Sequence, residues 1–149
     1  ESGSRDLILR TFRKGEGHVL LGTHSFWEGV DVVGDALSCV IVARLPFSSP
    51  GKPVLSARCA QLEREGTSGF RALSLPSAVL RLRQGFGRLI RHRGDRGLVI
   101  IADTRILSKS YGGIFRRSLP SPLQGCPDSS AFLAQITEAA THLLPTDSQ

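Results

Sequence analysis

The sequence predicts an α/β fold with one parallel sheet flanked by helices. Three short apolar segments, at residues 18–23, 39–45 and 97–102, have the length and the branched side chains of buried strands. Parallel strands are covered on both faces, so their sequences are apolar throughout rather than alternating. Segments with helical patterning separate the second strand from the third, which is typical of a sheet with helical crossovers.

The first half of the chain adds one helix and two loops to these strands. Residues 5–14 carry apolar side chains at helical spacing, and glycines at 15 and 17 follow them, so we expect a helix there. A glycine-containing loop over 25–35 joins the first two strands. Prolines at 46, 50 and 53 end the second strand and impose an irregular connection.

The second half is mainly helical. A break over 66–69 contains two glycines, Pro76 falls in the first turn of a long helix, and Ser129 is a candidate cap for the last helix. Three strands make a narrow sheet, and no strand precedes the first helix, so we expect the N-terminal part of a larger domain to be missing. We divide the chain into residues 1–124, a partial domain, and residues 125–149, its C-terminal helix and tail. The helices expected here cover residues 54–65, 75–91, 106–118 (one or two helices) and 129–144.

Composition favours a polyanionic partner and argues against a membrane protein. The net charge is +6, the isoelectric point is about 10.0, and 16 of the 19 basic residues are Arg. Codon bias would explain an excess of Arg, but not six of them between residues 81 and 96. No apolar stretch approaches the length of a membrane span. The three cysteines are widely spaced and predict neither a disulfide framework nor a metal site, which indicates a reducing, cytoplasmic setting.

The helix expected over 75–91 has two opposed faces. At about 100° per residue, one arc carries the apolar side chains, and the opposite arc carries three arginines and one amide. A solvated face is the simplest interpretation. Two glycines inside the helix, each costing about 1 kcal/mol relative to alanine, favour instead the close approach of an anionic ligand. The polar arc consists of Arg81, Gln84, Arg88 and Arg91.

Two further groups of polar residues follow predicted strands. The loop after the first strand offers hydroxyls at Thr23 and Ser25 and carboxylates at Glu28 and Asp31. Residues 103–105 follow the third strand, and we expect both groups at the carboxyl edge of the sheet, where α/β folds bind ligands. The chain contains no P-loop, no dinucleotide-binding glycine pattern, no hydrolase elbow and no zinc-binding His pair.

Four segments, in this order, resemble one family of enzymes. GTHSFWEGVDVVGD (22–35) is similar to motif V of superfamily-two helicases, and QGFGRLIR (84–91) to motif VI, with its Q-x-x-G-R-x-x-R pattern. VIVARLPFSSPGKP (40–53) and ADTRILSKSYGGIFRRSLP (102–120) resemble the DinG branch of the XPD-like DNA helicases. The resemblance covers about residues 5–120 and implies the second, C-terminal RecA-like motor domain of an ATP-dependent DNA helicase.

The resemblance also implies roles for single residues. Arg91 matches the arginine-finger position, Arg88 a companion contact to phosphate, and Gln84 and Gly87 the nucleotide-responsive part of motif VI. Glu28, Gly29 and Asp31 match the segment of motif V that faces ATP. Thr23 and Ser25 are placed to touch the nucleic-acid backbone, and Arg81, outside the motif, is a further candidate for such a contact.

The implied partners are single-stranded DNA and a first RecA-like motor domain. That domain would bind most of the ATP and Mg²⁺, so we expect little ATP hydrolysis from this chain alone. Many XPD-like proteins carry an iron–sulfur cluster in a part that has no counterpart here, so the resemblance allows such a cluster in a larger parent protein but not in this chain. Two alternatives remain open: a non-catalytic nucleic-acid-binding module and a helicase-derived domain for protein interaction.

Overall fold

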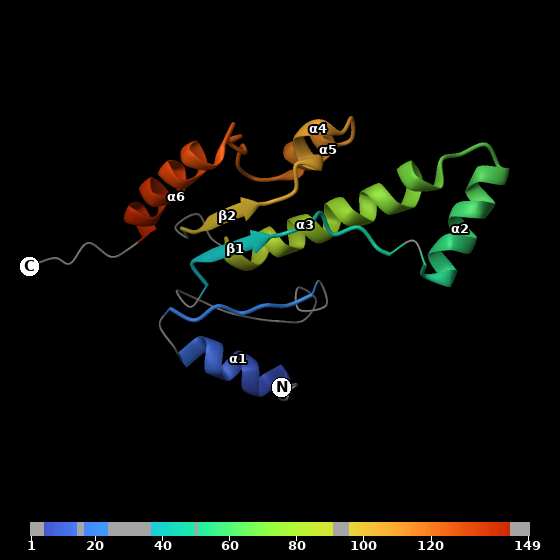
Figure 1. Ribbon diagram of the computed structural model, residues 1–149. Coiled ribbons are helices and arrows are strands. Elements are labelled where there is room, and N and C mark those ends of the chain that lie inside the picture. Colours follow the sequence, from blue (N-terminus) through green and yellow to red (C-terminus); the bar gives the residue numbers. More distant parts are fainter. Residues whose placement is uncertain (1–4, 15–16, 24–36, 50, 91–95, 144–149) are drawn as a thin grey trace, which may run out of the picture.

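The computed structural model describes residues 5–14, 17–23, 37–49, 51–90 and 96–143 (Figure 1). Within these residues, strands β1 (Cys39–Val42) and β2 (Leu98–Ile101) form a parallel sheet in which Cys39 lies opposite Leu98 and Val42 opposite Ile101. The parallel sheet expected from the sequence is confirmed at these two strands. The helical elements are α1 (Arg5–Lys14), α2 (Pro53–Arg64), the π-helix η2 (Phe70–Ser74), α3 (Leu75–Leu89), α4 (Arg105–Ser108), α5 (Gly112–Ser118) and α6 (Ser129–Leu143).

The core lies where α3 meets β1, α4 and α5. The chain leaves β1, runs out through α2, and returns through η2 and α3 to β2, so that these elements form the crossover between the strands (Figure 1). Helix α3 packs along β1 and contacts α5, while α6 lies against β2. The buried members of this core are Val42, Leu45, Leu75, Ala78, Leu82, Phe86, Ile106, Phe115 and Leu119.

The prediction of a strand over 18–23 was wrong. The described residues of this segment adopt no strand, and Val19 and Leu21 are 84% and 88% exposed. Only Leu20 packs inward, against Leu9 of α1. An apolar sequence does not make a strand by itself, because the backbone N–H and C=O groups need a paired neighbour.

The predicted helices are confirmed with small changes at their ends. Helix α1 has the expected bounds, and α2 begins one residue earlier, at a proline suited to the first turn. Helix α3 ends at Leu89 because Ile90 is extended (φ −115°, ψ 105°). The cap of α6 is Asp128 rather than Ser129: its carboxylate accepts a hydrogen bond from the N–H of Ala131 at 2.8 Å.

The break between α2 and α3 is confirmed and has two physical causes. Gly66 adopts φ +78°, a left-handed conformation that ends α2 at little cost for a residue without Cβ. A Cβ on Gly69 would lie 2.7 Å from the Cα of Cys59, so only glycine allows this approach to α2. The wider turn of η2 then precedes Pro76, whose ring would clash with a carbonyl of the preceding turn in a regular helix.

None of the helices in the described ranges is long and apolar enough to cross a membrane. The thiols of Cys39, Cys59 and Cys126 are free and half-buried. Burial raises the pKa of the Cys39 thiol above its ordinary value.

Candidate functional site

Helix α3 separates the core from the predicted polar face. Its buried residues are Leu75, Ala78, Leu82, Gly85, Phe86 and Leu89. On the other side, Gln84 and Gly87 are exposed and Arg88 is half-buried. The helix is therefore oriented by burial of its apolar arc, and the described residues of the Q-x-x-G-R pattern are left accessible.

The two glycines of α3 have different surroundings. Gly85 is buried on the core side. A Cβ placed on Gly87 would meet no atom of the described residues within 4 Å. Packing within this part of the chain therefore does not require glycine at position 87, although glycine weakens a helix by about 1 kcal/mol relative to alanine.

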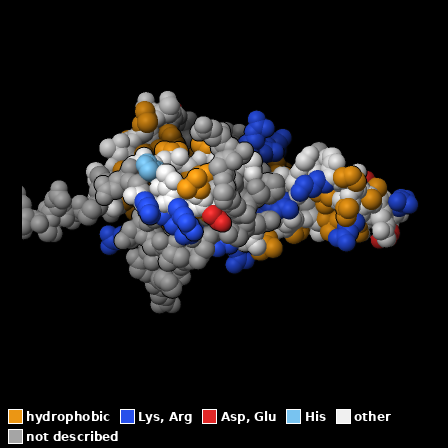
Figure 2. Space-filling model, turned by 90° about the horizontal axis from the view of Figure 1, so that it is seen from below, with side chains coloured by type: hydrophobic (Ala, Val, Ile, Leu, Met, Phe, Trp, Pro, Cys, Tyr) orange, Lys and Arg blue, Asp and Glu red, His pale blue; other side chains and the backbone are white. Residues whose placement is uncertain are grey.

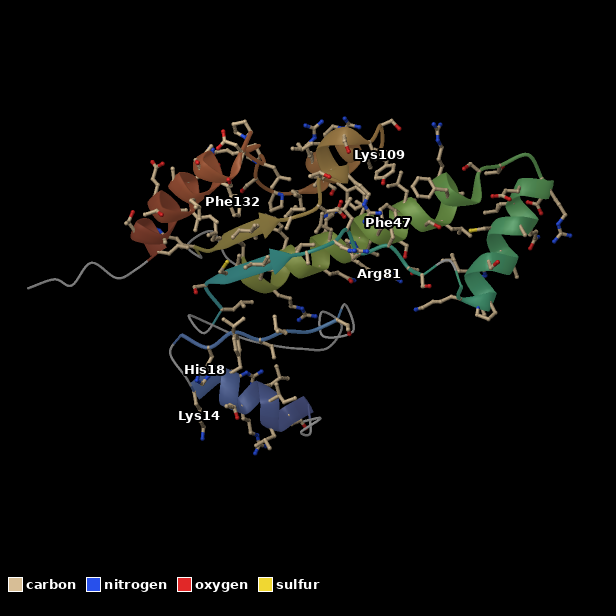
Figure 3. The ribbon with its side chains drawn as sticks, viewed as in Figure 1. Lys14, His18, Phe47, Arg81, Lys109 and Phe132 are labelled. Carbon is tan, nitrogen blue, oxygen red and sulfur yellow. The ribbon has the colours of Figure 1, made fainter. Side chains whose placement is uncertain are left out.

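Arg81 lies one turn before Gln84 and binds the segment that follows β1. Its Nη1 donates hydrogen bonds to the Oγ of Ser48 at 2.6 Å and to the carbonyl oxygen of Pro46 at 3.3 Å. Figure 3 shows Arg81 on α3 beside this segment. The sequence analysis placed Arg81 on the polar arc and made it a candidate for contact with the nucleic-acid backbone, but it missed the role of Arg81 in fixing this connection.

Asp103 is the buried polar centre of the carboxyl edge of the sheet. The residue is 8% exposed, and its carboxylate accepts a hydrogen bond from the backbone N–H of Leu45 at 2.8 Å. Arg105 donates to both carboxylate oxygens, with its Nη2 2.7 Å from Oδ2. The side-chain hydrogen bond from Arg105 lowers the pKa of Asp103 to about 2, against the opposing effect of burial.

An aromatic cluster, which sequence reasoning also missed, lies beside this pair. The ring of Phe47 lies 5.7 Å from that of Phe70, 5.6 Å from that of Tyr111 and 5.6 Å from that of Phe115, measured between centroids. The guanidinium of Arg105 stands 5.7 Å from the Phe47 ring centroid. Phe47 and Phe70 are far from each other and from the Tyr111–Phe115 pair in the sequence, so no spacing indicated that they join this cluster.

Several predicted site residues lie outside the described residues. These include the motif V loop and the end of motif VI, so the expected convergence of the loop with residues 103–105 is untested. Thr23 is described and exposed. Within the described ranges, no three His, Cys, Asp or Glu side chains come together as candidate metal ligands. The predicted residues outside these ranges are Ser25, Glu28, Gly29, Asp31 and Arg91.

The chain is similar to proteins named as helicases and exonucleases. It is 48% identical over 118 residues to the ATP-dependent DNA helicase YoaA of Haemophilus influenzae. The aligned region is 79% of this chain and 18% of that protein. It is 46% identical over 119 residues to the 3'-5' exonuclease DinG of Bacillus subtilis, an alignment over 80% of this chain and 13% of that protein. With the ATP-dependent helicase DinG of Mycobacterium tuberculosis the identity is 41% over 117 residues, 78% of this chain and 18% of the relative. The chain thus spans less than a fifth of the length of these relatives.

The family profile agrees with this similarity. The model of the helicase C-terminal domain matches residues 1–122, which include both helicase-like motifs and all the described elements from α1 to α5. The resemblance and the RecA-like fold class predicted from the sequence are thereby confirmed. With its parallel strands and the exposed motif VI residues of α3, this chain belongs to the helicase C-terminal domain family, in the DinG branch.

Proposed function

We propose that this chain is the C-terminal motor domain of an ATP-dependent DNA helicase. One observation carries the proposal: α3 buries its apolar arc and leaves Gln84, Gly87 and Arg88 accessible, at the spacing of motif VI. An arginine and an amide on a rigid helix can meet phosphate oxygens without rearranging the core. Helix α6, which packs against β2, completes the same domain in this proposal.

ATP in this proposal lies between this domain and a first RecA-like domain, which binds most of the nucleotide and the Mg²⁺. Arg91 supplies the arginine finger, and Arg88 contacts phosphate beside it. Glu28, Gly29 and Asp31 of motif V face the nucleotide, together with Gln84 and Gly87. The donors present suit the nucleotide, since Arg88 and Gln84 offer N–H groups and Gly87 leaves space for a close approach. When bound, ATP would supply the phosphoanhydride bond whose hydrolysis drives movement on DNA.

Single-stranded DNA is the proposed track. Thr23 and Ser25 contact its backbone in this scheme, and Thr23 is exposed. The net charge of +6 supports binding without sequence preference, because each neutralised phosphate releases counterions. The affinity of this chain for a single strand should therefore fall steeply as salt increases.

The test is Arg91→Ala in the full-length protein that carries this domain. An arginine that stabilises transition-state charge is worth about 10³–10⁵ in kcat, so single-turnover ATP hydrolysis should collapse while DNA affinity is retained. Arg83→Ala is the matched control, because Arg83 is exposed on α3 and lies off the polar arc. Normal ATP hydrolysis in Arg91→Ala would contradict the assignment of this chain as a motor domain. It would favour the interpretation as a non-catalytic nucleic-acid-binding module.

A further inference from the structure

A second basic site lies at the opposite end of α3 from motif VI. A pocket of about 330 Å³ opens between the N-terminal half of α2, the start of α3 and the segment after β1. It contains three cations from three different parts of the chain: Lys52, Arg58 and Arg81. Figure 2 shows Lys and Arg side chains interleaved with hydrophobic ones over the end of the molecule that α2 forms.

The rest of the lining suits a ligand with a charged and an apolar part. Three hydroxyls, from Ser48, Ser74 and Ser77, stand among the cations, and the described lining holds no carboxylate. The walls between them come from Val54, Leu55 and Leu73. Hydroxyls and guanidiniums donate hydrogen bonds to phosphate oxygens, and apolar walls cover a sugar or base edge.

The charge of α2 is graded along its length. Lys52, just before the helix, and Arg58 lie in the half nearest the pocket. At the far end, Glu63 and Glu65 flank Arg64, so the net charge there is negative. The helix dipole adds a partial positive charge at the same N-terminal end. Hydrogen bonds to Ser48 and Pro46 hold the Arg81 side chain at the pocket wall. Because this long side chain is already ordered, binding a ligand costs little of its conformational entropy.

We propose that this pocket binds one phosphate of a single-stranded nucleic acid, with Lys52 and Arg58 as its exposed contacts and Arg81 as its fixed wall. The site continues the polar arc of α3 beyond motif VI, and the roles implied by the family resemblance did not include Lys52 or Arg58. The assignment of this phosphate to a nucleic-acid strand rests on the proposed function. Binding at the pocket itself needs neither ATP nor the first motor domain.

A strand phosphate suits the pocket better than an acidic peptide or free phosphate. A carboxylate of an acidic peptide has two acceptor oxygens, whereas a strand phosphate presents two charged and two bridging oxygens to the three cations and three hydroxyls of the lining. Free phosphate would leave the apolar walls uncovered, since it carries no sugar or base to place against Val54 and Leu73. The pocket also lies on an end of the molecule where no residue of α2 is buried, so a long strand could pass it.

The experiment measures binding of a labelled oligothymidylate to this chain across a salt series. Arg58→Gln should lower the slope of log affinity against log salt by about 0.7, the value for one phosphate contact on a single strand. That change corresponds to roughly a fivefold to tenfold loss of affinity at 50 mM salt. Lys52→Gln provides a second variant with the same expected direction, and circular dichroism checks that both fold.

Arg64→Gln is the matched control. Arg64 is exposed on the same helix and lies outside this pocket. Arg64→Gln removes the same charge as Arg58→Gln, but the slope of log affinity against log salt should not change. Equal losses in Arg58→Gln and Arg64→Gln would overturn the proposal in favour of net charge alone. If Arg58→Gln weakened only the binding of inorganic phosphate, the strand assignment would be overturned. Neither result would affect the Arg91→Ala hydrolysis test, so the two proposals fail separately.

Discussion

The backbone N–H of Leu45 donates a hydrogen bond to the carboxylate of Asp103 at 2.8 Å. These two residues follow β1 and β2, so the bond joins the exits of the two parallel strands at one edge of the sheet. Arg105 neutralises the carboxylate from the other side and lies over the Phe47 ring. The Asp103 side chain thus accepts the hydrogen bond that a neighbouring strand would otherwise accept from Leu45. The sequence predicted a strand that ends at residue 45, but β1 ends at Val42.

Asp103→Ala should destabilise the chain. The change leaves the buried N–H of Leu45 without its acceptor and Arg105 without its ion partner, at a cost of about 1–3 kcal/mol in the free energy of unfolding. Urea unfolding followed by circular dichroism measures it. Asp103→Asn should cost less, because an amide oxygen can still accept from Leu45. Equal losses in the two variants would contradict the importance of that hydrogen bond.

The stability of the native chain should fall in acid partly through Asp103. Its pKa is lowered from an ordinary 3.8 to about 2 in the folded state, so the unfolded chain takes up the proton first. This contribution is fully present above about pH 4 and is lost as the pH falls towards 2. Unfolding measured between pH 5 and pH 2 should show a shallower decline in Asp103→Asn than in the native chain.

Gly87→Ala should separate folding from function. The new Cβ meets no described atom, so we expect the free energy of unfolding to rise by up to about 1 kcal/mol through improved helix propensity. ATP hydrolysis by the full-length protein should nevertheless fall, because the methyl group occupies space reserved for the nucleotide in our proposal. A more stable variant with unchanged hydrolysis would remove Gly87 from the site.

A pair of leucines on α3 tests the orientation of this helix. Leu82 is 1% exposed and Leu80 is 56% exposed. Leu82→Ala should therefore lower the free energy of unfolding by about 2–5 kcal/mol, because it opens a cavity in the core. Leu80→Ala should change it by less than about 0.5 kcal/mol. Similar losses in the two variants would mean that the helix faces the core differently, and the proposed phosphate-binding face would lose its basis.

Arg88→Ala should lower ATP hydrolysis as we propose for Arg91→Ala, but with an additional effect on KM. If Arg88 contacts the phosphates of bound ATP before the reaction, Arg88→Ala should raise KM for ATP as well as lower kcat. Arg88→Lys should recover little, because an ammonium cannot reproduce the planar, bidentate guanidinium. The measurement is DNA-stimulated hydrolysis at varied ATP concentration in the full-length protein. A pure KM effect would place Arg88 in binding alone.

The sequence by itself determined the helices and the two strands of the described sheet. The apolar arc of α3 and the continuous apolar runs of β1 and β2 are local patterns, so they could be recognised without knowing which partner they meet. The motif VI spacing likewise indicated an exposed face that carries Gln84 and Arg88. These predictions succeeded because burial of an amphipathic face is decided largely within one element.

Only the tertiary structure decided which segments meet. The run at 18–23 has the composition of a strand, but it adopts none here because strand formation depends on a neighbour's backbone groups. The contacts of Arg81 with Pro46 and Ser48, and of Asp103 with Leu45, join residues 33 to 58 positions apart. Such pairings, and the basic pocket that Arg81 and Ser48 line, arise when the crossover through α2 and α3 brings distant segments together, so sequence spacing carried no signal for them.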